Sequence, residues 1–502
     1  MKNKIKQFIN ITLIALLAIG VMGCEEDFLE TTPTTDISDQ DVFETTEGAQ
    51  TVLNGLYRWL REYDSGGTGR HEDMGQKSVD ITLDVLDGRD VILPYPSWYY
   101  FDHDLAFDFT QATYAKTRGI WEFYYKIINN CNNIVVNIDD SVGEDDEKNR
   151  IKGEAKALRA HAYFYLVNIF QHAYIEGGNQ PGVPIYLEPA TPESEGNPRG
   201  TVQEVYNQII LDLTDALTLL PASGVRGNKS HVNVNVAQGM LARAYLFMED
   251  WANAATAAAA ARVGYPLDNA ATYTSGFNDI DANGEWIWGL PFQQDQQHYY
   301  YSFFSMYDLQ RSAGYFNMRM NSGFLAEFSA TDIRANLAVD AYPLVVDKMA
   351  PPINADGYVT VADQYAIRKF RDKDDQTGHY VLMRSAEMIL IEAEAEAELT
   401  NYTNAQNLLF EVQQRADANA VKSTSTGQTL INEILLERRK ELYGEGLAST
   451  FDLKRRLLPL DRVGNHYFTG SLPAGSNMLT WQIPQEELDA NDNIGVADQN
   501  PL

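Results

Sequence analysis

Two clusters of aromatic residues mixed with amide-bearing residues are the part of the sequence best suited to chemistry. One is Trp98-Tyr99-Tyr100. The other runs through Gln293–Gln297 and His298 to Tyr299-Tyr300-Tyr301, with Tyr307, Tyr315 and Asn317 following. A pyranose ring has apolar C–H faces and a rim of hydroxyl groups. Flat aromatic rings can cover the faces, and Asn, Gln, Asp and Arg can bond the hydroxyls. The two clusters therefore predict a surface for carbohydrate.

Both clusters lie in segments that keep no period of 3.6 or 2, so their consecutive rings cannot all point into one core. Asp80, Asp84 and Arg368 are further polar candidates, which we expect on loops near the same face. The alternative for any single ring is that it packs a loop against the helices.

Common catalytic signatures are missing from the sequence. It contains no HExxH zinc site, P-loop, dinucleotide-binding glycine motif or Gly-x-Ser-x-Gly elbow. A glycosidase needs two carboxylates at a set distance, but with 70 acidic residues a chance pair is certain and proves nothing. We predict a binding protein with no enzymatic activity and no cofactor. A surface hydrolase is the alternative from another class.

The segment Asp279-Ile280-Asp281-Ala282-Asn283-Gly284 matches the start of an EF-hand calcium loop. Its twelfth position is Leu290, so the bidentate glutamate of such a loop is missing. We interpret the segment as a polar turn. The many carboxylates of the chain leave a structural calcium ion elsewhere as an open alternative.

Cys24 stands at the end of a short apolar run near the start of the chain. Three lysines come first, a stretch rich in Ile, Leu and Ala follows over residues 11–21, and Gly23 precedes the cysteine. The run is shorter than the roughly 20 residues of a membrane-spanning helix. The pattern resembles a bacterial lipobox, which implies that residues 1–23 are a signal peptide that is removed and that Cys24 is acylated, for example with palmitate. An ordinary signal peptide with an incidental cysteine is the alternative.

The charge of the chain excludes one class of partner. Its formal net charge is −31, and it becomes −34 without residues 1–23, which hold three lysines and no acid. A surface this acidic repels phosphate backbones, so we expect no nucleic-acid partner. If Cys24 is acylated, Cys131 is the remaining cysteine and no internal disulfide can form.

Apolar periodicity predicts a mainly α-helical scaffold. The expected helices lie near Thr46–Leu60, from Trp121 onward, over about Lys148–His172, after the capping box Thr201–Glu204, and over Leu430–Tyr443. Residues 61–117 and 264–380 are expected to be loop-rich inserts that carry function.

An internal repeat lies within this scaffold. Residues 242–254 recur in outline at 393–405, with small residues, then Trp251 or Tyr402 at a bend, then Ala254 or Ala405 on the returning helix. Small and aromatic residues at such offsets resemble a tetratricopeptide helix pair. Any alanine-rich helical hairpin is the alternative.

Further motifs follow one another along almost the whole chain. They are Asp27-Phe28-Leu29-Glu30; Trp121 with Tyr125, Ile128 and Asn132 or Asn133; Arg159, Tyr163 and Gly182-Val183-Pro184; Thr201-Val202, Tyr206, Asp212-Leu213 and Leu220-Pro221; Glu285–Trp288; Arg384–Ala395; and Glu437–Leu442, Gly444-Glu445-Gly446 and Phe451–Arg455. Together they resemble the SusD/RagB family of nutrient-uptake lipoproteins. Residues 447–450 depart from the family's usual Arg-aromatic pair, which puts the local turn and the salt bridge of that arginine in doubt.

The resemblance implies tetratricopeptide-like helix pairs under a loop-rich face, in a single domain over residues 41–502 that follows a lipidated tether over residues 24–40. It implies a cell-surface protein that binds an oligosaccharide and caps a SusC-like TonB-dependent transporter. Glu25-Glu26-Asp27 resembles the family's surface-export signal, which implies an outer-membrane anchor that faces the extracellular side. One alternative function is RagB-like uptake of peptides. The remaining alternative is a purely structural helical-repeat scaffold.

Overall fold

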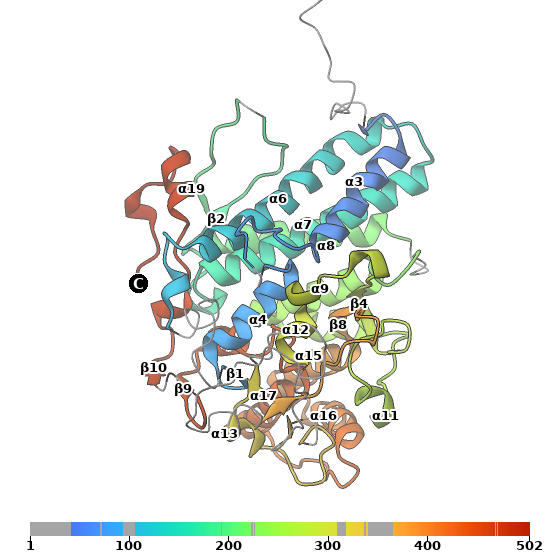
Figure 1. Cartoon of the computed structure of the whole chain (residues 1–502), viewed down its shortest axis with the longest axis vertical. Helices are drawn as coiled ribbons and strands as arrows, with labels where there is room; N and C mark the ends of the chain where they lie inside the picture. Colours follow the sequence, from blue (N-terminus) through green and yellow to red (C-terminus); the bar gives the residue numbers. More distant parts are fainter. Residues whose placement is uncertain are drawn as a thin grey trace, which may run out of the picture.

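The structure is a computed structural model in which the chain is mainly α-helical (Figure 1). The described residues are 42–70, 73–93, 106–191, 193–221, 224, 226–308, 318–335, 338–339, 365–466, 468 and 470–502. Among these residues, no helix combines the length and the apolar character needed to cross a membrane.

Long helices form the scaffold, and helices that follow one another in sequence pack side by side. α6 packs on α7, α7 on α8, α8 on α9, α9 on α10, α10 on α15, and α15 on both α16 and α17. The long helices are α3 (Thr46–Trp59), α6 (Ala115–Asn137), α7 (Asp145–Phe170), α8 (Val202–Leu219), α9 (Val234–Phe247), α10 (Trp251–Ala261), α15 (Ser385–Glu398), α16 (Tyr402–Ala416) and α17 (Gly427–Leu442).

The internal repeat forms two helical hairpins, α9–α10 and α15–α16, which pack against each other through α10 and α15. Trp251 and Tyr402 begin the returning helices, as the sequence predicts. The turns also match, since Glu249 and Thr400 occupy the same place in the repeat and both have left-handed backbones, with φ of 58° and 65°. The two copies therefore share a backbone path as well as a pattern of side chains.

Shorter elements fill the space between the scaffold helices. The helices are α4 (Gln76–Asp87), α11 (Ala270–Tyr273), α12 (Phe303–Tyr307), α13 (Ser322–Leu325), α18 (Thr450–Arg455) and α19 (Gln485–Ala490). The 3-10 turns are η2 (Asp108–Thr110), η3 (Ile138–Asp140), η4 (Tyr174–Glu176), η5 (Gln294–Gln296), η6 (Tyr299–Tyr301), η8 (Asn477–Leu479) and η9 (Val496–Asp498).

The strands are short and pair antiparallel. One four-stranded sheet has the order β1-β5-β7-β6, and three pairs are β2–β3, β4–β8 and β9–β10. Their bounds are β1 (Val91–Ile92), β2 (Pro181–Pro184), β3 (Arg199–Thr201), β4 (Trp286–Leu290), β5 (Arg319–Met320), β6 (Ala338–Val339), β7 (Ala366–Ile367), β8 (Tyr380–Arg384), β9 (Leu460–Arg462) and β10 (Gly470–Leu472).

The helices predicted from periodicity are confirmed, with shifted ends. The helix expected to open at Trp121 begins earlier, at Ala115. The sequence does not mark this start, because the first turns contain no apolar stripe. The capping box at the start of α8 is confirmed, since the Thr201 hydroxyl accepts the Glu204 N–H and the Glu204 carboxylate accepts the Thr201 N–H at 2.7 Å. Trp286 and Trp288 are fully buried in β4, also as predicted.

Residues 61–117 contain a helix that the sequence does not predict. Helix α4 lies within this segment, and all 12 of its residues are buried. It contacts α18 and β1. Its apolar and polar residues alternate one by one over Val79–Val85, a short run more typical of a strand than of a helix, so the sequence does not mark this segment as helical.

Candidate functional site

The loop over residues 291–302, between β4 and α12, presents the predicted tyrosine run to solvent. The side chain of Tyr299 is 57% exposed and that of Tyr300 is 38% exposed. The ring of Tyr301 stacks on the ring of Tyr63, with centroids 4.1 Å apart and planes 22° apart. We call Tyr63, Tyr299, Tyr300 and Tyr301 the tyrosine face. It offers flat ring surface beside the exposed polar segment 293–295.

Packing at its base holds this loop in place. The buried ring of Phe292 lies 4.6 Å from the ring of Tyr380, and the Arg61 guanidinium lies 4.7 Å from the Phe292 centroid. Burial lowers the pKa of Arg61. Further along, the Ser305 hydroxyl donates to the Tyr300 carbonyl at 2.7 Å. These contacts fix the backbone and leave the outer tyrosine rings on the surface.

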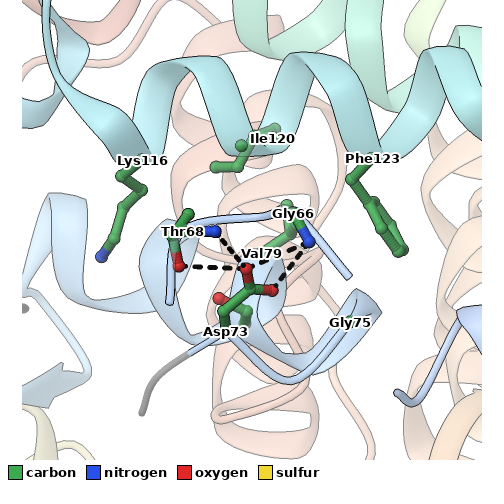
Figure 2. A pocket seen from close by; sticks show the side chains of 10 residues that line it. Gly66, Thr68, Asp73, Gly75, Val79, Lys116, Ile120 and Phe123 are labelled. Carbon is green, nitrogen blue, oxygen red and sulfur yellow. Dashed lines mark hydrogen bonds between the residues drawn. The ribbon is translucent and has the colours of Figure 1, made fainter. Parts of the chain in front are cut away.

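Tyr63 belongs to a turn that the Asp73 carboxylate organises (Figure 2). This carboxylate accepts the Gly66 N–H at 3.0 Å, the Thr68 N–H at 3.3 Å and the Thr68 hydroxyl at 3.0 Å. Burial raises the pKa of Asp73, and these hydrogen bonds oppose the rise. Lys116, Ile120 and other residues of α6 close the space around the turn, leaving a cavity of about 20 Å³. The carboxylate is thus a structural anchor.

We expect Asp73→Ala to loosen this turn, because the buried N–H of Gly66 and the half-buried N–H of Thr68 lose their acceptor. Leaving buried donors unsatisfied costs about 1–3 kcal/mol. Amide hydrogen exchange at both residues should accelerate, and the free energy of unfolding should fall. Asp64→Gly is the control, since Asp64 accepts one exposed bond from the Gly69 N–H at 2.6 Å and glycine tolerates its left-handed backbone, with φ of 57°. Equal effects from the two variants would contradict the anchoring role of Asp73.

The structure corrects the expected placement of three candidates. Asp80 and Asp84 lie inside α4 rather than on loops, and they are 2% and 1% exposed. Tyr307 is fully buried in α12, where its ring packs on Phe303 and Phe370. Arg368 follows β7 and is half-buried.

The surroundings of Asp80 and Asp84 indicate a structural role for both carboxylates. The Lys77 ammonium lies 2.7 Å from the Asp80 carboxylate. Burial, followed by the charges of Asp87 and Asp80, raises the pKa of Asp84 well above its usual range.

Other predicted positions lie outside the described residues, namely Cys24, Trp98, Tyr99, Tyr100, Tyr315 and Asn317. Tyr63 escaped the sequence analysis, because a lone tyrosine between charged residues gives no pattern. Only its closeness in space to Tyr301 identifies it as a candidate site residue.

The polar turn predicted at 279–284 is confirmed. The Asp279 carboxylate accepts the Asp281 N–H at 2.9 Å and the Ala282 N–H at 3.2 Å, and it pairs with Lys373 at 3.0 Å. Over the part of the chain that the structure describes, no group of three or more His, Cys, Asp or Glu residues is placed to hold a metal ion.

Fold and site together define a helical-repeat protein that presents aromatic rings on a surface loop. Residues 27–246 match a family described as "Starch-binding associating with outer membrane", and residues 358–502 match one described as "SusD family". The chain belongs to the SusD/RagB family.

Known relatives match most of the chain. A SusD-like protein of Formosa agariphila is 23% identical, over 97% of this chain and 98% of the relative. A crystal structure of a "SusD-like carbohydrate binding protein" from Bacteroides vulgatus has a TM-score of 0.80 at 29% identity, covering 91% of this chain and 98% of that one. A SusD superfamily protein from Bacteroides thetaiotaomicron gives a TM-score of 0.77 at 25% identity, over 91% and 100% of the two chains.

Proposed function

We propose that this chain binds oligosaccharide at the cell surface and delivers it to a SusC-like TonB-dependent transporter, which it caps. The observation that carries the proposal is the tyrosine face, where Tyr299 and Tyr300 are exposed beside the stacked pair Tyr63–Tyr301. Exposed rings with amide-bearing neighbours suit the C–H faces and hydroxyl rim of a sugar. Membership in the SusD/RagB family and the carbohydrate-binding description of the Bacteroides vulgatus relative support the same ligand class.

The proposal also covers how the protein is attached to the membrane. Acylation at Cys24 would anchor the chain in the outer leaflet of the outer membrane, and residues 24–40 would act as a tether. One lipid-bearing end would let the body lift from the transporter and return without leaving the membrane. Trp98, Tyr99, Tyr100, Tyr315, Asn317 and Arg368 remain proposed contributors to ligand binding.

We expect Tyr300→Ala to weaken oligosaccharide binding about two- to tenfold, because a stacked ring contributes roughly 0.5–1.5 kcal/mol. Tyr300→Phe is the matched control, since it keeps the ring and removes the hydroxyl, and it should retain most of the affinity. Calorimetric titration of the purified full chain with the strongest ligand from a glycan array measures both. Full affinity in Tyr300→Ala would refute the tyrosine face as the site, and full affinity in Trp98→Ala would count against Trp98 as a contributor.

Further measurements separate the rival functions. Binding to a peptide array, with no binding to the glycan array, would favour RagB-like peptide uptake. Release of new reducing ends from the bound oligosaccharide would indicate a surface hydrolase. Co-purification of a large outer-membrane barrel protein with the chain tests the transporter partnership.

A further inference from the structure

A cleft of about 630 Å³ lies beside α6, and no residue of the tyrosine face is among its lining residues. We call the residues of α6 that line it its floor and the lining residues 186–190, 194, 195 and 197 its roof, and Glu487 lines it as well. Figure 1 shows the chain after β2 rising as a long loop beside α6. The volume falls in the range of about 300–1,000 Å³ that is usual for small-ligand sites. We call this space the α6 cleft.

The floor of the α6 cleft is the motif that the sequence analysis singled out in this helix. Trp121, Tyr125, Ile128 and Asn132 all line it. Their spacings of four, three and four residues place them on one stripe of the helix. The motif therefore builds a concave surface outside the tyrosine face.

The roof is held by amide side chains of α6. The Asn132 side-chain amide donates to the carbonyls of Tyr186 at 3.1 Å and Glu188 at 3.0 Å. The Asn129 side-chain oxygen accepts the Ala190 N–H at 2.7 Å. The Tyr163 hydroxyl of α7 adds two more bonds, since it donates to the Tyr186 carbonyl at 2.9 Å and accepts the Tyr186 N–H at 2.7 Å. These bonds tie the irregular loop to α6 and α7.

A buried ion pair fixes Asn132 in turn. The Arg159 guanidinium donates to the Asn132 side-chain oxygen at 2.8 Å and pairs with the Asp212 carboxylate at 2.6 Å. Arg159 is 4% exposed, and Asp212 is fully buried. A surface arranged before a ligand arrives loses less entropy on binding, so this relay favours a binding role for the cleft.

The rings that line the cleft suit a sugar. Tyr125 and Tyr186 are half-buried, and their rings meet edge to face, with centroids 5.7 Å apart and planes 81° apart. Trp121 lies behind them, 4.8 Å from Tyr125. The amides of Asn130 and Asn197 lie at the rim among the lining residues.

Charge narrows the ligand class. Among the described lining residues, Lys126 supplies the single ammonium group, against the carboxylates of Glu122, Glu188, Glu195 and Glu487. The Lys126 ammonium also lies 5.2 Å from the ring centroid of Trp59 in α3. An anionic ligand would meet mostly like charge, whereas carboxylates and amides can accept and donate to neutral hydroxyl groups.

We infer that the α6 cleft is a second oligosaccharide-binding site, selective for neutral sugars. The inference takes its ligand class from the proposed function, but it concerns different residues. The protein would then hold one glycan chain, or two, at two separate places on its surface.

Hydrogen exchange of the full chain tests this inference with maltoheptaose, cellohexaose, xylohexaose, mannohexaose and laminarihexaose as neutral probes and an oligogalacturonate as an anionic probe. At millimolar concentration, at least one neutral probe should protect residues 186–191 and 121–132. Ala190→Trp should abolish this protection, since it places a large ring in the cleft while keeping the N–H that bonds Asn129. Glu193→Trp is the matched control, because Glu193 is exposed on the same loop and is not a lining residue.

The tyrosine face is scored separately on residues 291–302. Tyr300→Ala should weaken protection there and leave the cleft response unchanged, and Ala190→Trp should do the reverse. Failure at 291–302 alone counts against the proposed function and leaves the cleft standing. The cleft inference is overturned if no neutral probe protects 186–191, if Ala190→Trp keeps the protection, if the oligogalacturonate protects as well as the neutral probes, or if a protein partner alone protects the cleft.

Discussion

Replacing Arg384 with methionine should lower the free energy of unfolding by about 3–5 kcal/mol, because three buried carboxylates would lose their shared partner. The guanidinium lies 2.9 Å from Glu285, 2.6 Å from Glu441 and 2.9 Å from Glu445, and its side chain is fully buried. Replacing a whole buried ion pair with apolar residues can be neutral, but removing one partner leaves a charge unpaired in the interior.

The electrostatics of Glu441 show how strongly this cluster depends on its cations. Burial alone would raise its pKa, yet the guanidinium groups of Arg415, Arg384 and Arg334 hold the pKa of Glu441 well below its usual range. Arg384 also joins distant parts of the chain, since β8 carries the arginine, Glu285 precedes β4, and Glu441 belongs to α17. Its loss should therefore weaken the packing of β4, β8 and α17 against one another, and not only one turn.

Urea unfolding measures this prediction, with Arg58→Met as the matched control. Arg58 pairs with Glu62 at the surface, where its side chain is 69% exposed, and such pairs contribute about 0.2–1 kcal/mol. The double variant Arg384→Met with Glu285→Gln should recover part of the loss, because Glu285 would keep only the more distant Arg415, at 3.5 Å. Equal midpoints for Arg384→Met and Arg58→Met would show that the cluster adds no net stability.

The sequence predicts some helices of this fold far better than others. The start of α8 follows from local rules, because the Thr201–Glu204 box satisfies the first N–H groups within four residues. Helix α4 does not, because its apolar and polar residues alternate one by one over Val79–Val85, which is more typical of a strand. Some contacts around it are also remote in sequence. Arg439 pairs with Asp90 just beyond the helix, and the Ser449 hydroxyl donates to Asp87. Such long-range compensation leaves no trace in a local window.

The candidate site shows the same division. Three consecutive tyrosines outside any helical period are a visible surface signal, and the structure exposes two of them. Tyr63 joins them through the turn anchored at Asp73, so its contribution exists only in three dimensions. The α6 cleft is an intermediate case. The sequence marks the stripe from Trp121 to Asn132, but the roof depends on bonds to a loop more than 50 residues later.

The segment that departs from the family pattern has a defined structure here. Glu445 pairs with Arg384 and with Lys369, at 2.9 Å and 2.6 Å. The Thr450 hydroxyl donates to the Leu83 carbonyl of α4, and the Arg89 guanidinium donates to the Ser449 carbonyl at 3.0 Å. The turn doubted from the sequence is therefore tied to α4 by hydroxyl groups and by another arginine. It brings the backbone of Gly446 directly against this helix.

Gly446→Ala should be among the most damaging substitutions of a single methyl group in this chain. Gly446 has φ of 89°, and an added Cβ would lie 2.5 Å from the Cβ and 2.6 Å from the Cα of Asp80. The left-handed backbone costs a non-glycine residue about 1–2 kcal/mol, and overpacking a buried contact costs typically about 1–3 kcal/mol more. Asp80 cannot retreat easily, because it is 2% exposed and paired with Lys77.

Gly264→Ala separates the two costs. Gly264 has nearly the same backbone, with φ of 86°, but an added Cβ there meets no atom within 4 Å. It should therefore lose only the conformational part, about 1–2 kcal/mol. Thermal and urea unfolding of both variants give the difference, which measures the contact between residue 446 and α4. Losses of equal size would mean that α4 yields to the added methyl group, and the close approach of the two segments would then contribute little to stability.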